Sequence, residues 1–160
     1  MAHHGAPLPP MRGPCGRSTS RGVMVSDWHM RPWTLTDVED AVRAGWGADT
    51  CDPVDLDDWH PGNPARGQCG ATALVLHDVF GGELVLGEVH VGGERTGYHY
   101  WNRFGIVDVD LTRGQFRPDE VVVSGRVVVR PPGPPRRCAE QYALLRSRVL
   151  ARLGPDQTST

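Results

Sequence analysis

The chain has 160 residues, of which 22% are charged and 39% hydrophobic, and its formal net charge is −2. This length predicts one compact domain, and no stretch approaches the roughly 18 apolar residues that a membrane helix requires. The charge balance also lacks the basic footprint of a nucleic-acid-binding protein. Because no secretory signal pattern is present either, we expect a cytoplasmic protein that binds neither membranes nor nucleic acids.

The basic residues and the cysteines exclude further kinds of chemistry. All 17 basic residues are arginine, so the chain has no lysine for Schiff-base or pyridoxal chemistry, for a phosphate loop or for a serine–lysine dyad. The four cysteines show no C-x-x-C spacing, which predicts reduced thiols; they are Cys15, Cys51, Cys69 and Cys138. The sequence predicts no cofactor and no metal.

Composition divides the chain into three parts. Residues 1–25 are rich in Gly, Pro, Ser and Arg with few apolar anchors, and we expect a disordered tail there. A single domain is predicted over 26–154, and 155–160 form a second, short tail.

The domain is predicted to begin with a helix and a loop. Thr36 is the expected N-cap, Glu39 stands at the capping-box spacing, and the helix runs to Gly45. The following segment, 49–68, places several aspartates between Pro and Gly breaks, which predicts a solvated acidic loop.

The rest of the domain predicts a buried helix packed on a sheet. The segment 69–80 is apolar nearly all round and is stopped by two glycines. Period-two patterns then predict antiparallel strands at 83–91, 97–104, 106–111 and 120–129, the last with a bulge or turn at Gly125, and a closing helix at 137–153. The expected class is α+β, with the central helix on an antiparallel sheet of three to five strands between N- and C-terminal helices.

Cys69 is the leading candidate for a catalytic residue. It begins the predicted central helix, where the partial positive charge of a helix N-terminus favours thiolate over thiol. A nucleophilic cysteine also needs a base, a group that orients the base, and donors for the developing oxyanion. The sequence offers His99 as the base and Gln68, with the backbone N–H of Cys69, as the oxyanion donors.

Two aspartates compete for the role of orienting His99. Asp108 and Asp110 lie on the next predicted strand and share a face, because strand side chains alternate. A hairpin that turns at Gly105 brings either carboxylate opposite His99. Asp110 is the first choice and Asp108 the second.

Other polar and aromatic residues are secondary candidates. Asn102 follows His99 by three residues, so it points to the opposite strand face and is expected to pin a turn rather than to serve as the third catalytic group. Trp59 and Trp101 either flank a cleft or fill the core.

Two further expectations concern other polar residues of the domain. Thr112 and Gln115 are expected to cap the turn after Asp110. A metal site in which His60 or His90 joins His99 is a weaker alternative, because no short ligand spacing supports it.

The residues carry two resemblances. The order of cysteine on a helix, histidine on a strand and aspartate on the next strand resembles papain-like and transglutaminase-like cysteine enzymes. A longer pattern resembles the YunG family of uncharacterised bacterial proteins over about 33–153. Its matching positions are Trp59, Asn63, Pro64, Gly67, Gln68, Cys69, Thr72, Ala73, Leu74, Asp78, Gly81, Gly82, His99, Asn102, Asp110, Leu111, Thr112, Gln115 and Phe116. The second resemblance implies a fold and a possible site, and no particular reaction.

Two functions follow from these observations. The first is a cysteine-dependent hydrolase, deamidase or amide transferase acting on a small-molecule or peptide amide, with Cys69 as nucleophile and His99 as base and then acid. The alternative is a non-catalytic binding module in which the same residues pack or contact a ligand. An enzyme requires Cys69 to be partly accessible and close to His99, whereas a packing role requires it to be sealed.

Overall fold

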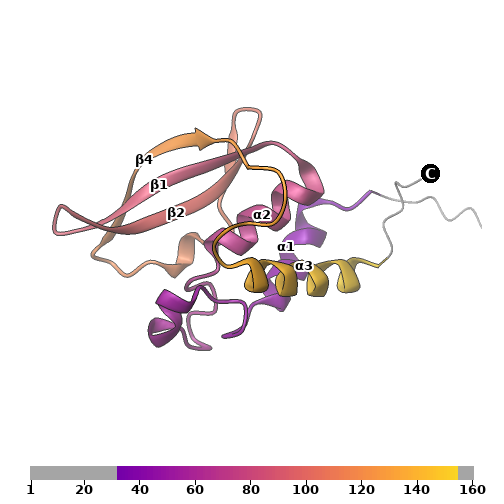
Figure 1. Cartoon of the computed structure of the whole chain (residues 1–160), viewed down its shortest axis with the longest axis horizontal. Helices are drawn as coiled ribbons and strands as arrows, with labels where there is room; N and C mark the ends of the chain where they lie inside the picture. Colours follow the sequence, from indigo (N-terminus) through magenta and orange to yellow (C-terminus); the bar gives the residue numbers. More distant parts are fainter. Residues whose placement is uncertain (1–31, 155–160) are drawn as a thin grey trace, which may run out of the picture. The chain divides into compact units, whose positions relative to one another are not determined.

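In the computed structural model, which describes residues 32–154, the chain begins with helix α1 (Leu35–Gly45) (Figure 1). Its N-cap is Thr34, whose hydroxyl accepts from the backbone N–H of Asp37 at 3.2 Å, while the Asp37 carboxylate accepts from the Thr34 N–H at 2.8 Å. The capping box expected at Thr36 and Glu39 is therefore wrong, because the same spacing is used two residues earlier. The predicted tails at 1–25 and 155–160 lie outside the described residues.

Helix α2 (Cys69–Phe80) is confirmed at the predicted position. It ends at Gly81, whose φ of 70° lies in the left-handed region that favours glycine. The long segment between α1 and α2 is more ordered than expected, because it contains the 3₁₀ helix η1 (Pro53–Asp58).

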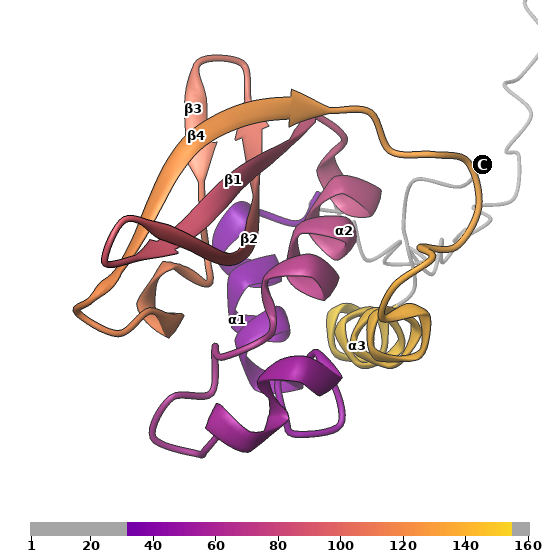
Figure 2. The same cartoon turned by 60° about the vertical axis from the view of Figure 1, so that its left-hand side comes forward.

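Four antiparallel strands form one sheet, with β1 (Glu83–Val91) and β2 (Glu94–Phe104) at its centre. The spatial order is β3-β2-β1-β4, which places the short β3 and β4 (Glu120–Val128) at the two edges, and Figure 2 shows the curved course of β4. Strand β3 (Val107–Val109) has only three residues and is followed by the 3₁₀ helix η2 (Arg113–Gln115). The strand expected at 106–111 thus ends before Asp110.

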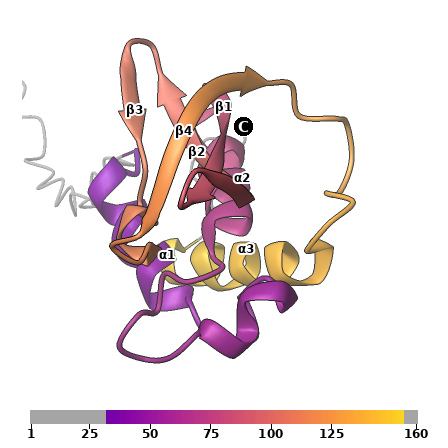
Figure 3. The same cartoon turned by 90° about the vertical axis from the view of Figure 1, so that its left-hand side faces the viewer.

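The predicted irregularity at Gly125 is a bulge in β4. Leu86 pairs with Arg126 and Glu88 pairs with Val123, so two residues of β4 stand opposite Gly87. One of the two, Ser124, has a φ of 59°. A bulge of this kind bends the strand and increases its twist, as the curvature of β4 in Figure 3 shows.

Helix α3 (Ala139–Leu153) closes the domain. It begins two residues later than predicted, because Cys138 has a φ of 54° and therefore cannot belong to a right-handed helix. Within the described part of the chain, none of the helices combines the length and apolar character that a membrane crossing requires.

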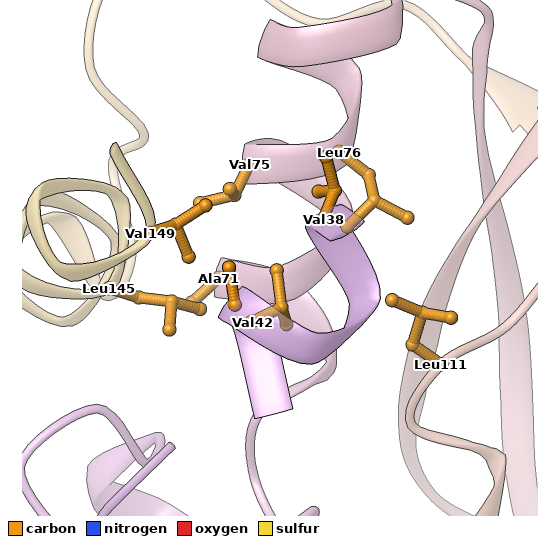
Figure 4. Close-up of a cluster of buried hydrophobic side chains, with 9 residues drawn as sticks. Val38, Val42, Ala71, Val75, Leu76, Leu111, Leu145 and Val149 are labelled. Carbon is orange, nitrogen blue, oxygen red and sulfur yellow. The ribbon is translucent and has the colours of Figure 1, made fainter. Parts of the chain in front are cut away.

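The three helices share one apolar core, shown in Figure 4. Its fully buried side chains come from all three helices and are Val38, Val42, Val75, Leu76, Leu145 and Val149. Leu111, just after β3, joins them from the sheet side. Helix α2 also contacts β1 and β2, so it stands between the helical core and the sheet. The observed class is α+β, as the sequence predicts.

Candidate functional site

His99 is the centre of a buried polar cluster. It lies on β2, only 1% of it is exposed, and its Nε2 is 2.7 Å from Oδ2 of Asp110. Trp101, two residues along the same strand, stacks on the imidazole with ring centroids 5.6 Å apart. Phe116 approaches with its ring nearly perpendicular, at 4.8 Å. The ring is therefore fixed both by its hydrogen bond and by its aromatic neighbours.

The structure selects Asp110 rather than Asp108 as the partner of His99. The second oxygen of Asp110 accepts from the backbone N–H and the hydroxyl of Thr112, at 3.1 and 3.2 Å, which holds the carboxylate in place. Asp108 instead pairs with Arg103 at 2.6 Å, and these bonds lower the pKa of Asp108. The two aspartates do not share a strand face, because β3 ends at Val109 and the chain turns there.

Cys69 begins α2, is partly exposed, and interacts with His99. Burial lowers the pKa of His99, but the hydrogen bond with Asp110 and the hydrogen bond and charge of Cys69 outweigh it, and the pKa rises to about 9. The structure thus brings Cys69, His99 and Asp110 together. An imidazole in this setting is held as a cation when a thiolate stands beside it.

The other described cysteines have a different environment. Burial, together with the charges of Asp55 and Asp52, raises the pKa of Cys51 to about 12, and its thiol donates to the carbonyl of Asp52 at 3.3 Å. Burial and Asp52 raise the pKa of Cys138 to about 11. Both side chains remain thiols at neutral pH, and thiols are poor nucleophiles.

Gln68 is fully buried immediately before Cys69. Its amide nitrogen donates to the carbonyl of Gly47 at 2.9 Å, and its Oε1 has no partner among residues 32–154. One of its two amide hydrogens is therefore committed to the loop after α1, which leaves one for another acceptor.

Gln115 is a member of the cluster that the sequence reasoning missed. Its amide Nε2 lies 3.2 Å from Nδ1 of His99, and the residue is 4% exposed. The expected turn cap is therefore wrong for Gln115, and the side chain of Thr112 makes no cap hydrogen bond to η2 either, because its hydroxyl and its N–H donate back to Asp110. The sequence signal that could have found Gln115 is the pattern D-L-T-x-x-Q-F. It places Asp110 and Gln115, the residues hydrogen-bonded to the two ring nitrogens of His99, within six residues.

Of the secondary candidates, only Trp101 lies at the cluster. Trp59 donates to the carbonyl of Pro64 at 3.3 Å and so closes a turn of its own loop. Asn102 donates to the carbonyl of Ala73 at 2.9 Å, which ties β2 to α2, so the expectation that it pins a turn is wrong.

The segment 49–68 is not a solvated acidic loop. Asp52 pairs with Arg137 at 2.7 Å, and Asp55 and Asp58 pair with Arg66 at 3.0 and 3.2 Å. Arg66 is 12% exposed and also binds Glu120 at 2.9 Å. Asp49 pairs with Arg148 as well, so among the described residues Asp57 is the one aspartate of this segment that is exposed and has no ion pair.

The histidines considered as metal ligands lie in local contacts of their own. Nδ1 of His60 accepts from the N–H of Gly62 at 3.1 Å, and Nε2 of His90 is 2.9 Å from Glu88. Across residues 32–154, no group of three or more His, Cys, Asp or Glu side chains is arranged to hold a metal ion.

Comparison with known proteins identifies the family. The family model described as "YunG protein" matches residues 34–154. The chain is also similar to the uncharacterized protein YunG of Bacillus subtilis (strain 168), with 37% identity over 59 residues. That match covers 37% of this chain and 47% of the relative, so it spans about half the length of the relative. No solved structure matches. The chain therefore belongs to the YunG family, as the pattern from Trp59 to Phe116 indicates.

Proposed function

We propose that this protein is a cysteine-dependent acyl-transfer enzyme, acting as a hydrolase, a deamidase or an amide transferase on a small-molecule or peptide amide. The proposal depends on one observation: His99, 1% exposed, is held by Asp110 at 2.7 Å and interacts with the partly exposed Cys69. A purely packed cysteine has no need of a buried histidine and carboxylate aligned behind it.

The order of the elements supports a papain-like or transglutaminase-like core as part of the same proposal. Cys69 is the first residue of α2, His99 lies on the central strand β2, and Asp110 follows β3, the neighbour of β2. In this arrangement a helix N-terminus and a strand face one site from two sides. The helix dipole then assists the anion while the strand holds the base rigidly.

In the first half of the proposed reaction, the Cys69 thiolate attacks the carbonyl carbon of the amide. A C–S bond forms, and the carbonyl π electrons move to oxygen. When the tetrahedral intermediate collapses, the C–N bond breaks and the leaving nitrogen takes the proton of the His99 imidazolium. The products of this half are an amine and a thioester at Cys69.

In the second half, water attacks the thioester and gives its proton to His99. The C–S bond breaks, a carboxylic acid leaves, and the thiolate–imidazolium pair is restored. If an amine attacks in place of water, the same steps give a new amide, which is the transferase outcome. Asp110 keeps the imidazole oriented throughout and balances its charge.

The oxyanion has candidate donors at the start of α2. None of the described side chains caps this helix, so backbone N–H groups of its first turn, that of Cys69 included, have no helical partner. The remaining amide hydrogen of Gln68 is the proposed side-chain donor.

The test is alkylation of the full-length chain by iodoacetamide across pH, quantified separately for each cysteine by mass spectrometry. Cys51 and Cys138 are internal controls, because their pKa values are raised to about 12 and about 11. We expect Cys69 to react at least about a hundredfold faster than either near pH 7. The variant His99→Gln, close in size and without a titrating group, should slow Cys69 about tenfold or more.

Two results would contradict the proposal. One is a Cys69 that reacts no faster than a cysteine in an unfolded peptide at every pH. The other is a folded His99→Gln variant, checked by its unfolding midpoint, in which Cys69 keeps the wild-type rate. Either result favours the alternative, a non-catalytic binding module on the same fold.

A further inference from the structure

Both ring nitrogens of His99 have a side-chain neighbour. Nε2 is taken by Asp110 at 2.7 Å, so in the proposed function Nδ1 is the nitrogen that exchanges a proton with Cys69. Gln115 places its amide 3.2 Å from that same Nδ1. We propose that Gln115 is a positioning residue, whose amide N–H holds Nδ1 of the neutral imidazole and whose carbonyl, after a half-turn, shares the Nδ1 hydrogen of the imidazolium with Cys69. This inference rests on the proposed function and deepens it.

The backbone of Gln115 is fixed on both sides. Its N–H donates to the carbonyl of Thr112 at 2.9 Å, and its own carbonyl accepts from Nδ2 of Asn63 at 3.0 Å. With the main chain held in this way and the residue 4% exposed, only the side chain is left to respond to a change at His99. Asn63 thereby ties the loop before α2 to the His99 site.

The proposed reaction changes what Nδ1 requires of its neighbour. A neutral imidazole with its hydrogen on Nε2 has a lone pair at Nδ1, and the Gln115 N–H donates to it. An imidazolium carries a hydrogen at Nδ1, which an N–H group opposes and a carbonyl oxygen accepts. A half-turn of the amide about its last carbon–carbon bond exchanges the two groups with almost no change in shape.

The chemistry of the neighbouring side chains suits an amide at this place. Trp101 stacks on the ring and Phe116 contacts it at 4.8 Å, and neither carries a charge. The titratable groups facing His99 are Asp110 and Cys69. A residue that only donates would favour the neutral ring, and a carboxylate would favour the cation. Glutamine serves both states without repacking the site.

Two substitutions separate this role from a packing role. Gln115→Met keeps the length of the side chain and removes both hydrogen-bonding groups. Gln115→Glu keeps the length and leaves only acceptors at neutral pH. Gln141→Met on α3 is the matched control for loss of a glutamine elsewhere in the domain.

The primary measurement is the ¹⁵N NMR titration of the His99 ring in the full chain, assigned by comparison with His99→Gln. We expect Gln115→Glu to raise the His99 midpoint by about one unit or more, because a carboxylate stabilises the adjacent cation. Gln115→Met should shift the Nδ1 resonance of the neutral ring and slow Cys69 alkylation several-fold near pH 7. The control variant should leave both unchanged.

The inference is overturned if the folded Gln115 variants change thermal stability alone and keep the wild-type His99 titration. Failure of the proposed function looks different: Cys69 would react like an ordinary thiol while His99 still responds to Gln115→Glu. The NMR measurement therefore tests the contact at Nδ1 independently of any activity of Cys69.

Discussion

This domain has two polar clusters, one partly buried and one almost fully buried, and they differ in whether their members exchange protons. The Arg66 cluster consists of Arg66, Arg117, Asp55, Asp58 and Glu120, joined by ion pairs between 2.9 and 3.4 Å. The His99 cluster consists of Cys69, His99, Asp110 and Gln115. Both are built on residues close to the start of α2 and the edges of the sheet.

The ion pair at the centre of the first cluster, Arg66 with Glu120, keeps one charge state. Burial opposes the charge of Glu120, but the backbone N–H of Arg117 and the guanidinium of Arg66 lower the pKa of Glu120 overall. Arg66 is buried too, and its bonds with Glu120 still raise its pKa above the ordinary value. Neither side chain exchanges a proton near neutral pH. The pKa of His99, about 9, is close enough to neutral pH for its imidazolium to give up a proton. The proposed site therefore differs from the Arg66 cluster in having a proton that can be exchanged, and not in the burial of charge.

The largest effect should come from breaking the Arg66 cluster. Arg66→Met leaves Glu120, whose side chain is 5% exposed, with only the exposed guanidinium of Arg117, and we expect a loss of about 3–5 kcal/mol in the free energy of unfolding. Urea unfolding measures it. Arg43→Met, which breaks the exposed pair with Glu39 and the contact of the guanidinium with the Trp46 ring, is the control and should cost about 1 kcal/mol or less. A loss below about 1 kcal/mol for Arg66→Met would show that the cluster is not structural.

The second effect is the pH dependence that the His99 cluster adds. The folded pKa of His99, about 9, lies above its ordinary value of 6.5, so protonated His99 stabilises the fold fully below pH 6.5. This contribution, at most on the order of 3 kcal/mol, is lost as the pH rises through about 9. The advantage of wild type over His99→Gln in urea unfolding should therefore shrink between pH 6.5 and about 9. If this advantage instead grows with pH in this range, folding does not raise the pKa of His99 and the prediction is wrong.

A smaller effect separates the two aspartates near His99. Asp110→Asn keeps the shape of the side chain but removes the charge that faces the imidazole, and we expect Cys69 alkylation near pH 7 to slow by about tenfold. Asp108→Asn is the matched control, because Asp108 is half exposed and pairs with Arg103. It should leave the rate unchanged. Equal effects of the two substitutions would remove the assignment of Asp110.

The smallest effect tests whether the Arg66 cluster depends on one cation or two. Arg117 is 55% exposed, although it contacts Asp58 and Glu120. Water screens such pairs, so Arg117→Met should cost under about 1 kcal/mol in the same unfolding assay. A cost equal to that of Arg66→Met would mean that the two arginines act as a unit.

Local patterns in the sequence located most of the fold. Strand β1 and helix α2 begin and end where alternation, apolar content and the glycines after Phe80 predict. The errors arose where two local signals compete. Thr34 and Thr36 both stand three residues before an acid, and the sequence alone does not say which hydroxyl reaches the helix N-terminus.

The candidate site was predictable in its type and only partly in its members. Cys69, His99 and Asp110 follow from residue chemistry and order. Gln115 and Asn63 do not, because their partners lie 16 and 52 residues away and are brought together by the turn after β3. The choice between Asp108 and Asp110 depends on the end of β3 at Val109, a boundary that alternation alone does not fix.

The bulge in β4 also constrains how this sequence can evolve. A Cβ at Gly125 would lie 2.6 Å from the indole of Trp101, and one at Gly87 would lie 2.9 Å from the same ring. That indole stacks on His99, so a larger residue on the outermost strand would displace the imidazole two strands away. Substitution of these two glycines is therefore limited by the position of His99 and not by the strands that carry them. We expect relatives that retain the His99 site to retain both glycines.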